Sequence, residues 1–388
     1  MFAVGSLISN LGTWSQYVGI GWAAREFTDS ETLLGVAFAS QFVASLLLSP
    51  LAGVVADRFD RRRIVIAGNL AMIVPPALVG LLVHTGDANI VNLIGLVFLG
   101  GVGFAFTQPA AAALVPSLVP AESTQQAIAL NGVLTHGTRI VGPGLGAAAI
   151  GAWGIAGGFY LNAVSFLAVV VACFLMSARP GRPAATTESF FVRLRAGIEY
   201  ARQRPVVGWV LIIVGVTTFF AMQAALMPIF AKDILGGDVG TYAALSAAPG
   251  IGAIGGLAFA GEIRRDRTRK IVIVGSVMAI GLALITVGSS RSIPLSVCAL
   301  GLFGSGYFML VTVGTTMVVE ASSNEYRGRV MGLLAMMSAG MVPITSILAG
   351  VIASAIGATW TVGLCGAATL GFASWLIGSG RVRHLRTG

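Results

Sequence analysis

Long apolar stretches, separated by short charged or turn-rich segments, dominate this chain of 388 residues. A helix that crosses a membrane needs about 20 predominantly apolar residues, and twelve stretches meet that requirement. We expect transmembrane helices near residues 3–24, 33–56, 64–84, 90–113, 127–150, 157–178, 206–230, 240–262, 271–289, 294–319, 330–355 and 359–378. The pattern predicts an all-α integral membrane protein with twelve transmembrane helices.

These segments form two halves that repeat each other. Residues 129–151 align with residues 329–351 at an offset of 200, which places Gly132 over Gly332 and Pro143 over Pro343. After the eighth expected helix, GEIRRDRTRKIVIVG is a degraded copy of ADRFDRRRIVIAG, which follows the second. Two matches in the same order indicate a tandem repeat. We therefore expect two pseudo-symmetric six-helix bundles.

A polar segment separates the two halves. We expect an N-terminal six-helix bundle at 1–178, a cytoplasmic linker at 179–205, a C-terminal six-helix bundle at 206–380 and a basic tail at 381–388. The first part of the linker is rich in Pro, Thr and Ala, and we expect it to be flexible. The second part interleaves apolar residues with arginines, which indicates an amphipathic helix on the inner leaflet. A solvated connector is the alternative.

Composition and charge agree with a membrane location. Hydrophobic residues make up 56% of the chain and charged residues 10%, whereas soluble domains carry about 25% charged residues. Of the 24 lysines and arginines, 20 lie in alternate connecting segments and the tail, and cytoplasmic loops collect these residues. We expect a multi-pass protein of the inner membrane, surrounded by lipid, with both termini in the cytoplasm. The net charge of +9 then reflects topology, not nucleic-acid binding.

The stretch LAGVVADRFDRRRI, residues 51–64, carries the most specific motif of the sequence. The residues that fit the pattern G-x-x-x-D-R-x-G-R-R are Gly53, Asp57, Arg58, Arg61, Arg62 and Arg63. With the two six-helix halves and the basic middle segment, this motif resembles the major facilitator superfamily over essentially the whole chain. Asp60 stands where that family usually has glycine, so we expect a somewhat strained turn with a positive φ there.

Shorter stretches resemble the enterobactin-exporter-like branch of that superfamily. They are SNLGTW (9–14), FTQPA (106–110), LVP with ALNG (118–132) and RIVGP (139–143). Members of this branch export siderophores, drugs and other small amphiphiles, so the resemblance implies an exporter that works by alternating access. It also implies proton antiport. The sequence departs from these relatives because the cores of the first and fourth expected helices contain no Asp or Glu.

The resemblance gives the motif loop a role in conformational change. We expect Gly53 to let the second helix approach a neighbour closely. Asp57 can face the positive N-terminus of the eleventh helix, near Arg327 and Arg329. Asp57 is thus a candidate latch between the two halves in one state. The alternative is that the arginines of the loop serve only as topology anchors.

Arg139 is the only basic residue deep inside an expected span. Arginine at the bilayer centre costs roughly 3 kcal/mol, so its head must reach water, a carbonyl or an anionic substrate. His136 lies three residues earlier on the same helix face, either as a buried histidine or as a group that moves protons. Gly142 and Pro143 resemble the GP signature of exporters, where proline lets the backbone flex.

Further candidates lie on the first, fourth, seventh and tenth helices, which the resemblance places around the substrate path. The candidate proton or polar sites are Glu320, Asn10 and Gln16. The candidate substrate contacts are Trp14, Tyr17, Gln108, Gln223 and Tyr307. Helix packing is the alternative for each of these residues.

The sequence contains no motif for ATP hydrolysis, for a metal or for a cofactor. A phosphate-binding glycine loop would follow a strand, and the three histidines and three cysteines are scattered. We expect no enzyme, no cofactor and no bound metal. The function we expect is that of a monomeric, proton-coupled exporter of siderophore-like or drug-like molecules. Two alternatives remain, an uncoupled facilitator or importer of a small metabolite, and a receptor or scaffold that does not transport.

Overall fold

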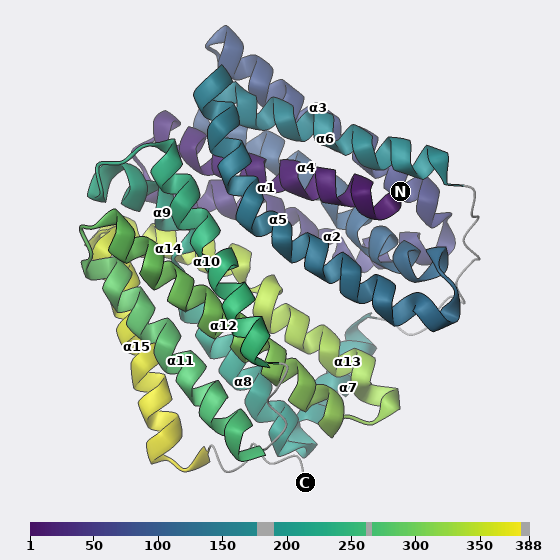
Figure 1. The fold of residues 1–388 in the computed structure, drawn as a ribbon, viewed down its shortest axis with the longest axis vertical. Helices are drawn as coiled ribbons and strands as arrows, with labels where there is room; N and C mark the ends of the chain where they lie inside the picture. Colours follow the sequence, from purple (N-terminus) through teal and green to yellow (C-terminus); the bar gives the residue numbers. More distant parts are fainter. Residues whose placement is uncertain (177–189, 261–265, 382–388) are drawn as a thin grey trace. The chain divides into compact units, whose positions relative to one another are not determined.

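The computed structural model describes residues 1–176, 190–260 and 266–381, which are mostly helical (Figure 1). The first half contains α1 (Phe2–Phe27), α2 (Glu31–Arg58), α3 (Arg61–Thr85), α4 (Ile90–Leu114), α5 (Thr124–Trp153) and α6 (Ile155–Leu175), with the short helices η1 (Val115–Leu118) and η2 (Ala121–Ser123). The second half contains α7 (Phe190–Gln203), α8 (Pro205–Phe220), η3 (Ala224–Leu226), α9 (Met227–Ile229), η4 (Phe230–Ile234), α10 (Val239–Ala260), α11 (Asp266–Ser289), α12 (Ile293–Ala321), α13 (Asn324–Ala335), η5 (Met336–Gly340), α14 (Val342–Ile356) and α15 (Ala358–Gly378).

The expected all-α membrane fold is confirmed. Among the described residues, nine helices or helical runs are long and apolar enough to cross a membrane. α1, α5 and α10 are not among these nine, although each coincides with one of the expected spans. The total of twelve therefore stays a prediction.

Polar side chains cap the N-termini of helices at the end of polar connecting segments. Asn89 Oδ1 accepts hydrogen bonds from the backbone N–H groups of Val91 and Asn92, both at 3.0 Å, and so begins α4. Asp60 begins α3 in the same way, since its Oδ1 accepts from the N–H groups of Arg62 at 2.8 Å and Arg63 at 3.2 Å. Such caps satisfy N–H groups that lack a partner within the helix.

The expected strained turn at Asp60 is wrong. Its φ is −60°, and none of the residues that the structure describes, other than glycines, has a positive φ. The physical reason is the cap, because an extended backbone lets the carboxylate reach the first N–H groups of α3.

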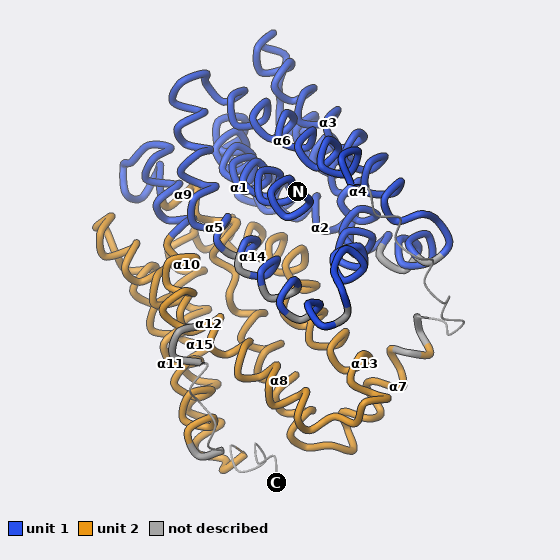
Figure 2. The backbone as a smooth tube through the Cα atoms, turned by 45° about the vertical axis from the view of Figure 1, so that its right-hand side comes forward, with its two compact units in different colours: residues 1–187, 231–247 blue, residues 188–230, 248–388 orange. Residues whose placement is uncertain are grey.

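The described helices form two compact units (Figure 2). Unit 1 contains residues 1–187 and 231–247, and unit 2 contains residues 188–230 and 248–388. In unit 1, α1 packs on α5 and α6, and α3 packs on α4 and α6. In unit 2, α11 packs on α12 and α15. The division does not follow chain order, because residues 231–247 belong to unit 1.

The repeat predicted from the sequence is visible in helix positions. α5 begins at Thr124 and α13 begins at Asn324, the offset of 200 residues seen in the alignment. A glycine with a positive φ follows α5 in the first half and α14 in the second, Gly154 at 68° and Gly357 at 85°. Glycine adopts this left-handed backbone without steric cost.

A helix, α7, lies within the expected linker range and packs on α13 within unit 2. The rings of Tyr200 and Tyr326 stack with centroids 4.6 Å apart. The backbone N–H of Ser323 donates to the Tyr200 hydroxyl at 3.0 Å, and this bond lowers the pKa of Tyr200 below its ordinary value. These contacts tie α7 to the start of α13.

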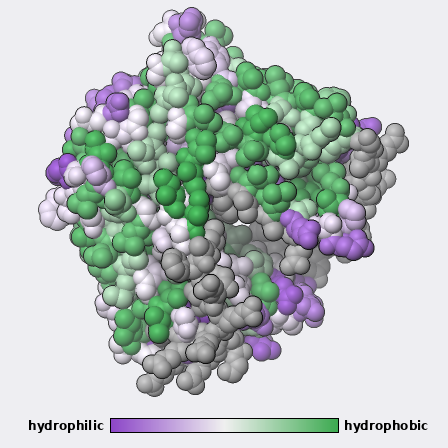
Figure 3. All heavy atoms as spheres, in the orientation of Figure 1, coloured by the Kyte–Doolittle hydropathy of each residue, from purple (hydrophilic) through white to green (hydrophobic). Residues whose placement is uncertain are grey.

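Large apolar side chains cover much of the face shown in Figure 3, and hydrophilic residues gather in small groups near its margins. Exposed examples are Leu47, Val91 and Phe174. Apolar surface of this extent suits contact with lipid tails.

Close backbone contact holds α11 and α15 together. A Cβ atom built on Gly366 would lie 2.7 Å from the carbonyl oxygen of Gly281 and 2.7 Å from the backbone nitrogen of Ile285. Helices in lipid associate largely through such contacts between small residues. Neither backbone can retreat without moving its helix.

We therefore predict that Gly366→Leu destabilises the protein by about 1–3 kcal/mol, the range for overpacking. The matched control is Gly371→Leu on the same helix, because no described atom lies within 4 Å of a Cβ at Gly371. Thermal unfolding in detergent measures both variants. Equal melting temperatures for the two variants would contradict the proposed packing.

Candidate functional site

The GP segment of α5 packs directly on α1 in unit 1. Ser15 Oγ, fully buried, donates hydrogen bonds to the carbonyl oxygens of Gly142 at 3.0 Å and Leu11 at 2.8 Å. A Cβ on Gly146 would lie 2.6 Å from the Ser15 carbonyl oxygen. Gly142 and Gly146, four residues apart, thus share the α5 face that meets α1. α5 therefore packs tightly on α1 at both glycines.

This packing places Arg139 of α5 beside the aromatic residues of α1. The guanidinium carbon of Arg139 lies 4.8 Å from the centre of the Trp14 ring. The ring centroids of Trp14 and Tyr17 lie 5.4 Å apart. The Tyr17 ring in turn contacts Phe38 of α2, with ring centroids 5.2 Å apart. A cation over an aromatic face is stabilised by the ring's quadrupole. The result is a charge next to a row of aromatic rings, which we call the arginine–aromatic row.

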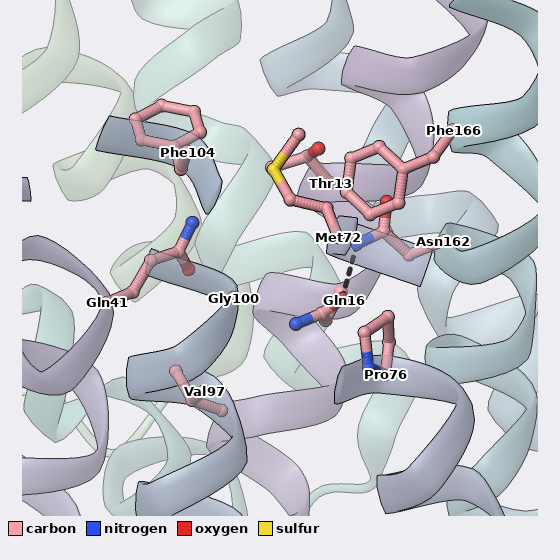
Figure 4. A pocket seen from close by; sticks show the side chains of 10 residues that line it. All are labelled: Thr13, Gln16, Gln41, Met72, Pro76, Val97, Gly100, Phe104, Asn162 and Phe166. Carbon is pink, nitrogen blue, oxygen red and sulfur yellow. Dashed lines mark hydrogen bonds between the residues drawn. The ribbon is translucent and has the colours of Figure 1, made fainter. Parts of the chain in front are cut away.

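A second feature of unit 1 is a small pocket with a mixed polar and apolar lining (Figure 4). Its volume is about 20 Å³, enough for one water molecule. The lining residues are Thr13, Gln16, Gln41, Met72, Pro76, Val97, Gly100, Phe104, Asn162 and Phe166. The amide of Asn162 donates a hydrogen bond to Gln16 Oε1, and Gln41 faces Gln16 across the gap. The pocket at Gln16 is therefore uncharged, and it places a few hydrogen-bonding side chains among apolar ones.

The arginines of the motif loop bind the ends of other helices. Arg61 Nη1 donates to the Ala113 carbonyl oxygen at 2.9 Å, and Arg62 Nη2 donates to the Phe174 carbonyl oxygen at 3.3 Å. These carbonyls end α4 and α6, where the helix dipole favours a cation. Arg58 and Arg63 are exposed.

The structure does not describe the side chains of Asp57, the predicted latch, and His136, a predicted proton carrier. No described atom lies within 4 Å of a Cβ built on Gly53. The close helix contact expected there stays a prediction.

In unit 2, Glu320 at the end of α12 pairs with Arg269 of α11. Arg269 Nη1 lies 2.5 Å from Glu320 Oε2, and Nη2 lies 2.9 Å from Oε1. The arginine is buried, with 7% of its surface exposed, and the Glu320 side chain is partly exposed. Such a two-point pair is stronger and more directional than a single ion contact.

The other candidates of unit 2 are Tyr307, which contacts a helix break from within α12, and Gln223, which lies at one. The Tyr307 hydroxyl donates to the Ser338 carbonyl oxygen at 3.0 Å and lies 3.3 Å from Thr218 Oγ1. Ser338 belongs to η5, a π-helical turn, and such turns often mark functional positions. Gln223 is buried between α8 and η3, and its Oε1 has no partner among the described residues.

The remaining two candidates stand apart from these groups. Gln108 of α4 is exposed and Asn10 of α1 is partly buried. Neither lines the pocket at Gln16. Both stay predictions.

The sequence interpretation missed Gln41 and Asn162 of the pocket, Ser15 between α1 and α5, and Arg269. One signal existed for Arg269. Aligning IVIAG (64–68) with IVIVG (271–275) places Arg269 over Arg62 in the repeat. Gln41 and Asn162 had no such signal, because an isolated polar residue in an apolar helix does not reveal its neighbours.

Comparison with known proteins agrees with this architecture. A model of the transmembrane secretion effector family matches residues 1–386. Macrolide efflux protein A of Streptococcus pyogenes is 26% identical over 86% of this chain and 83% of its own length. The staphyloferrin A transporter of Staphylococcus aureus is 22% identical over 95% of this chain and 93% of its own length. The enterobactin exporter of Salmonella choleraesuis is 23% identical over 73% of this chain and 68% of its own length.

Solved structures share the fold. A single-site mutant of the nucleoside transporter NupG superposes with a TM-score of 0.78 over 97% of this chain and 98% of that chain. The sequence identity is 11%. The likeness therefore concerns the arrangement of helices alone.

The contact between α5 and α1 gives a direct prediction for the candidate site. Leucine in place of Gly146 overlaps the Ser15 backbone and separates Arg139 from Trp14, so we expect about 1–3 kcal/mol of destabilisation. Gly144→Leu is the control, because a Cβ at Gly144 meets no described atom within 4 Å. Thermal unfolding measures stability, and near-ultraviolet circular dichroism reports the environment of the aromatic rings. Wild-type values for both in Gly146→Leu would rule out the contact.

Proposed function

Because the chain belongs to the transmembrane secretion effector family of the major facilitator superfamily, we propose that it exports small amphiphilic molecules of siderophore-like or drug-like character. Membership of this family makes the chain a membrane transporter and not an enzyme. The names of two relatives, a macrolide efflux protein and an enterobactin exporter, support export over import, and that of a third, the staphyloferrin A transporter, supports a siderophore-like substrate.

The arginine–aromatic row is the structural observation that carries this proposal. An amphiphile has an apolar body and at least one polar group. Trp14, Tyr17 and Phe38 offer ring faces, and Arg139 offers a cation beside them. Ligand sites are commonly of this kind, mostly apolar with few polar groups. The pocket at Gln16 adds a few neutral hydrogen-bonding groups in the same unit.

We propose that the protein lies in the inner membrane with both termini in the cytoplasm. The arginine-rich loop between α2 and α3 supports this orientation, because cytoplasmic loops collect arginine. We further propose that it works as a monomer in contact with lipid, with two six-helix halves that alternate access to a central site.

Proton antiport is the coupling mode we propose, with Glu320 and His136 as the candidate proton carriers. Glu320 is bound to Arg269 by two hydrogen bonds. Protonation would neutralise the carboxylate and weaken this pair. A proton at Glu320 would thereby loosen the contact between the ends of α11 and α12, which links proton binding to helix movement.

The first test is transport itself. Cells with and without the protein are loaded with fluorescent dyes and ferric siderophores, and accumulation is followed before and after an uncoupler is added. We expect lower accumulation in expressing cells and loss of that difference with the uncoupler. Unchanged accumulation of every compound would contradict export, and efflux that ignores the uncoupler would contradict proton antiport.

The latch proposed at Asp57 predicts a specific defect. Asp57→Asn removes a charge that can interact with a helix N-terminus, an interaction worth up to about 2 kcal/mol. We expect efflux of the transported compound to fall by about five- to thirtyfold, the range that about 1–2 kcal/mol produces. Asp87→Asn, in the exposed segment between α3 and α4, is the control. Normal efflux by Asp57→Asn at equal expression would reject the latch.

A further inference from the structure

Two tryptophans of unit 2 meet where α8 begins and α15 ends (Figure 2). Trp209 lies in the second turn of α8, and Trp375 lies in the last turn of α15. Their ring centroids are 6.2 Å apart, and the Phe372 ring stacks on Trp375 with centroids 5.9 Å apart. The packing of α8 on α15 thus gathers three aromatic rings at one end of the unit.

The chain turns after α15 and brings Arg381 against both tryptophans. Gly380 has a φ of 67°, which glycine adopts without steric cost, and its N–H donates to the Ile377 carbonyl oxygen at 3.2 Å. Turns of this kind commonly end helices. The guanidinium carbon of Arg381 lies 4.7 Å from the centre of the Trp375 ring and 5.0 Å from that of Trp209. Both rings attract the cation, so they hold its position although Arg381 is exposed.

The described part of the protein does not neutralise this charge. The Arg381 side chain forms no hydrogen bond or ion pair with any described residue, and α8 and α15 contain no Asp or Glu. Aromatic rings orient a cation but have no net charge to balance it. The guanidinium N–H groups form a planar fork that matches the oxygens of a phosphate. The position therefore offers a charge and several donors to an anion from outside the protein.

The surroundings of Arg381 are those of a lipid headgroup. α8 and α15 belong to helical runs that are long and apolar enough to cross a membrane, and tryptophans near the ends of such helices lie at the membrane surface. The Trp375 side chain is 44% exposed. Phe372 and Ile212 lie one helical turn further from the helix ends than the tryptophans, and both are at least partly exposed. Apolar side chains thus continue from the cation towards the membrane interior.

We propose that Arg381, Trp209 and Trp375 form a binding site for the phosphate of an anionic phospholipid, which we call the headgroup site. The Arg381 guanidinium pairs with the phosphate oxygens, the tryptophan rings contact the glycerol region, and Phe372 and Ile212 contact the acyl chains. In the proposed orientation this end of unit 2 faces the cytoplasmic leaflet, where anionic lipids gather. The site concerns the contact of unit 2 with the membrane and does not depend on export.

The charge of the headgroup decides which lipid the site prefers. A zwitterionic lipid has an ammonium group next to its phosphate, and that group is repelled by Arg381. An anionic lipid has no such group, so the whole attraction is realised. An arginine that serves only as a topology anchor has no such preference, because it needs only to reach the polar surface. Selectivity between lipids therefore distinguishes the two roles.

The tryptophans themselves report lipid contact. Trp153 and Trp360 are strongly exposed, so both are replaced by phenylalanine to lower their share of the signal. The full chain is reconstituted in vesicles of phosphatidylcholine and phosphatidylglycerol in equal amounts, and one lipid at a time has brominated acyl chains, which quench tryptophan fluorescence on contact. The same protein with Trp375→Phe shows how much of the quenching arises at the headgroup site.

We expect phosphatidylglycerol to occupy the site about fivefold better than phosphatidylcholine, the effect of one arginine at an anionic surface. Arg381→Gln should remove this preference. Arg381→Lys should leave an intermediate preference, because lysine keeps the charge but lacks the planar fork. The matched control is Arg291→Gln, which removes one charge from the exposed connection between α11 and α12 and should leave the preference unchanged.

Equal quenching by the two brominated lipids in the starting protein would overturn the headgroup site and leave Arg381 as a topology anchor. The same conclusion would follow if Arg381→Gln kept the preference of Arg291→Gln. Loss of the preference when inorganic phosphate is added at constant ionic strength would show that the site binds free phosphate and would overturn the lipid assignment. Monodisperse elution of every variant shows that it is folded.

Discussion

Close contact between helix backbones is the interaction on which the rest of this structure depends. Lipid tails are as apolar as leucine, so helices in a membrane gain little from apolar burial and associate through small residues and satisfied polar groups. Unit 1 shows this where Gly142 and Gly146 meet Ser15, and unit 2 shows it where Gly281 meets Gly366. Each unit contains a contact that a single larger side chain would separate.

The candidate site follows from that packing. Because α5 lies against α1 without intervening side chains, Arg139 reaches the Trp14 ring and its charge lies over an aromatic face. A charge inside a membrane protein needs such a partner, since its transfer into hydrocarbon is costly. The cost of burying an unbonded polar group also explains the pocket. There Asn162 donates a hydrogen bond to Gln16 among mostly apolar neighbours. A row of rings with one cation, next to neutral amides, is suited to molecules that are partly apolar and partly polar.

Much of the fold could be predicted because membrane helices follow from length and apolarity. The offset of 200 residues predicted the repeat, and the first residues of α5 and α13, Thr124 and Asn324, preserve it. Asp60 shows where resemblance misleads, since a turn that relatives make with glycine is here a helix cap made by a carboxylate. The pairing of Arg269 with Glu320 and the hydrogen bond of Asn162 with Gln16 depend on contacts between distant segments. Hydrophobic pattern does not contain that information.

The most direct measurement is substrate flux in vesicles that contain only the purified protein and an imposed pH gradient. With a siderophore or dye whose efflux it supports in cells, we expect uptake into the vesicles to follow the gradient and to stop when the gradient is collapsed. Trp14→Leu should weaken that flux, because it removes the aromatic face beside Arg139. Proton-coupled export through this site would be contradicted by flux that is absent, or that is unchanged by both the collapse of the gradient and the loss of Trp14.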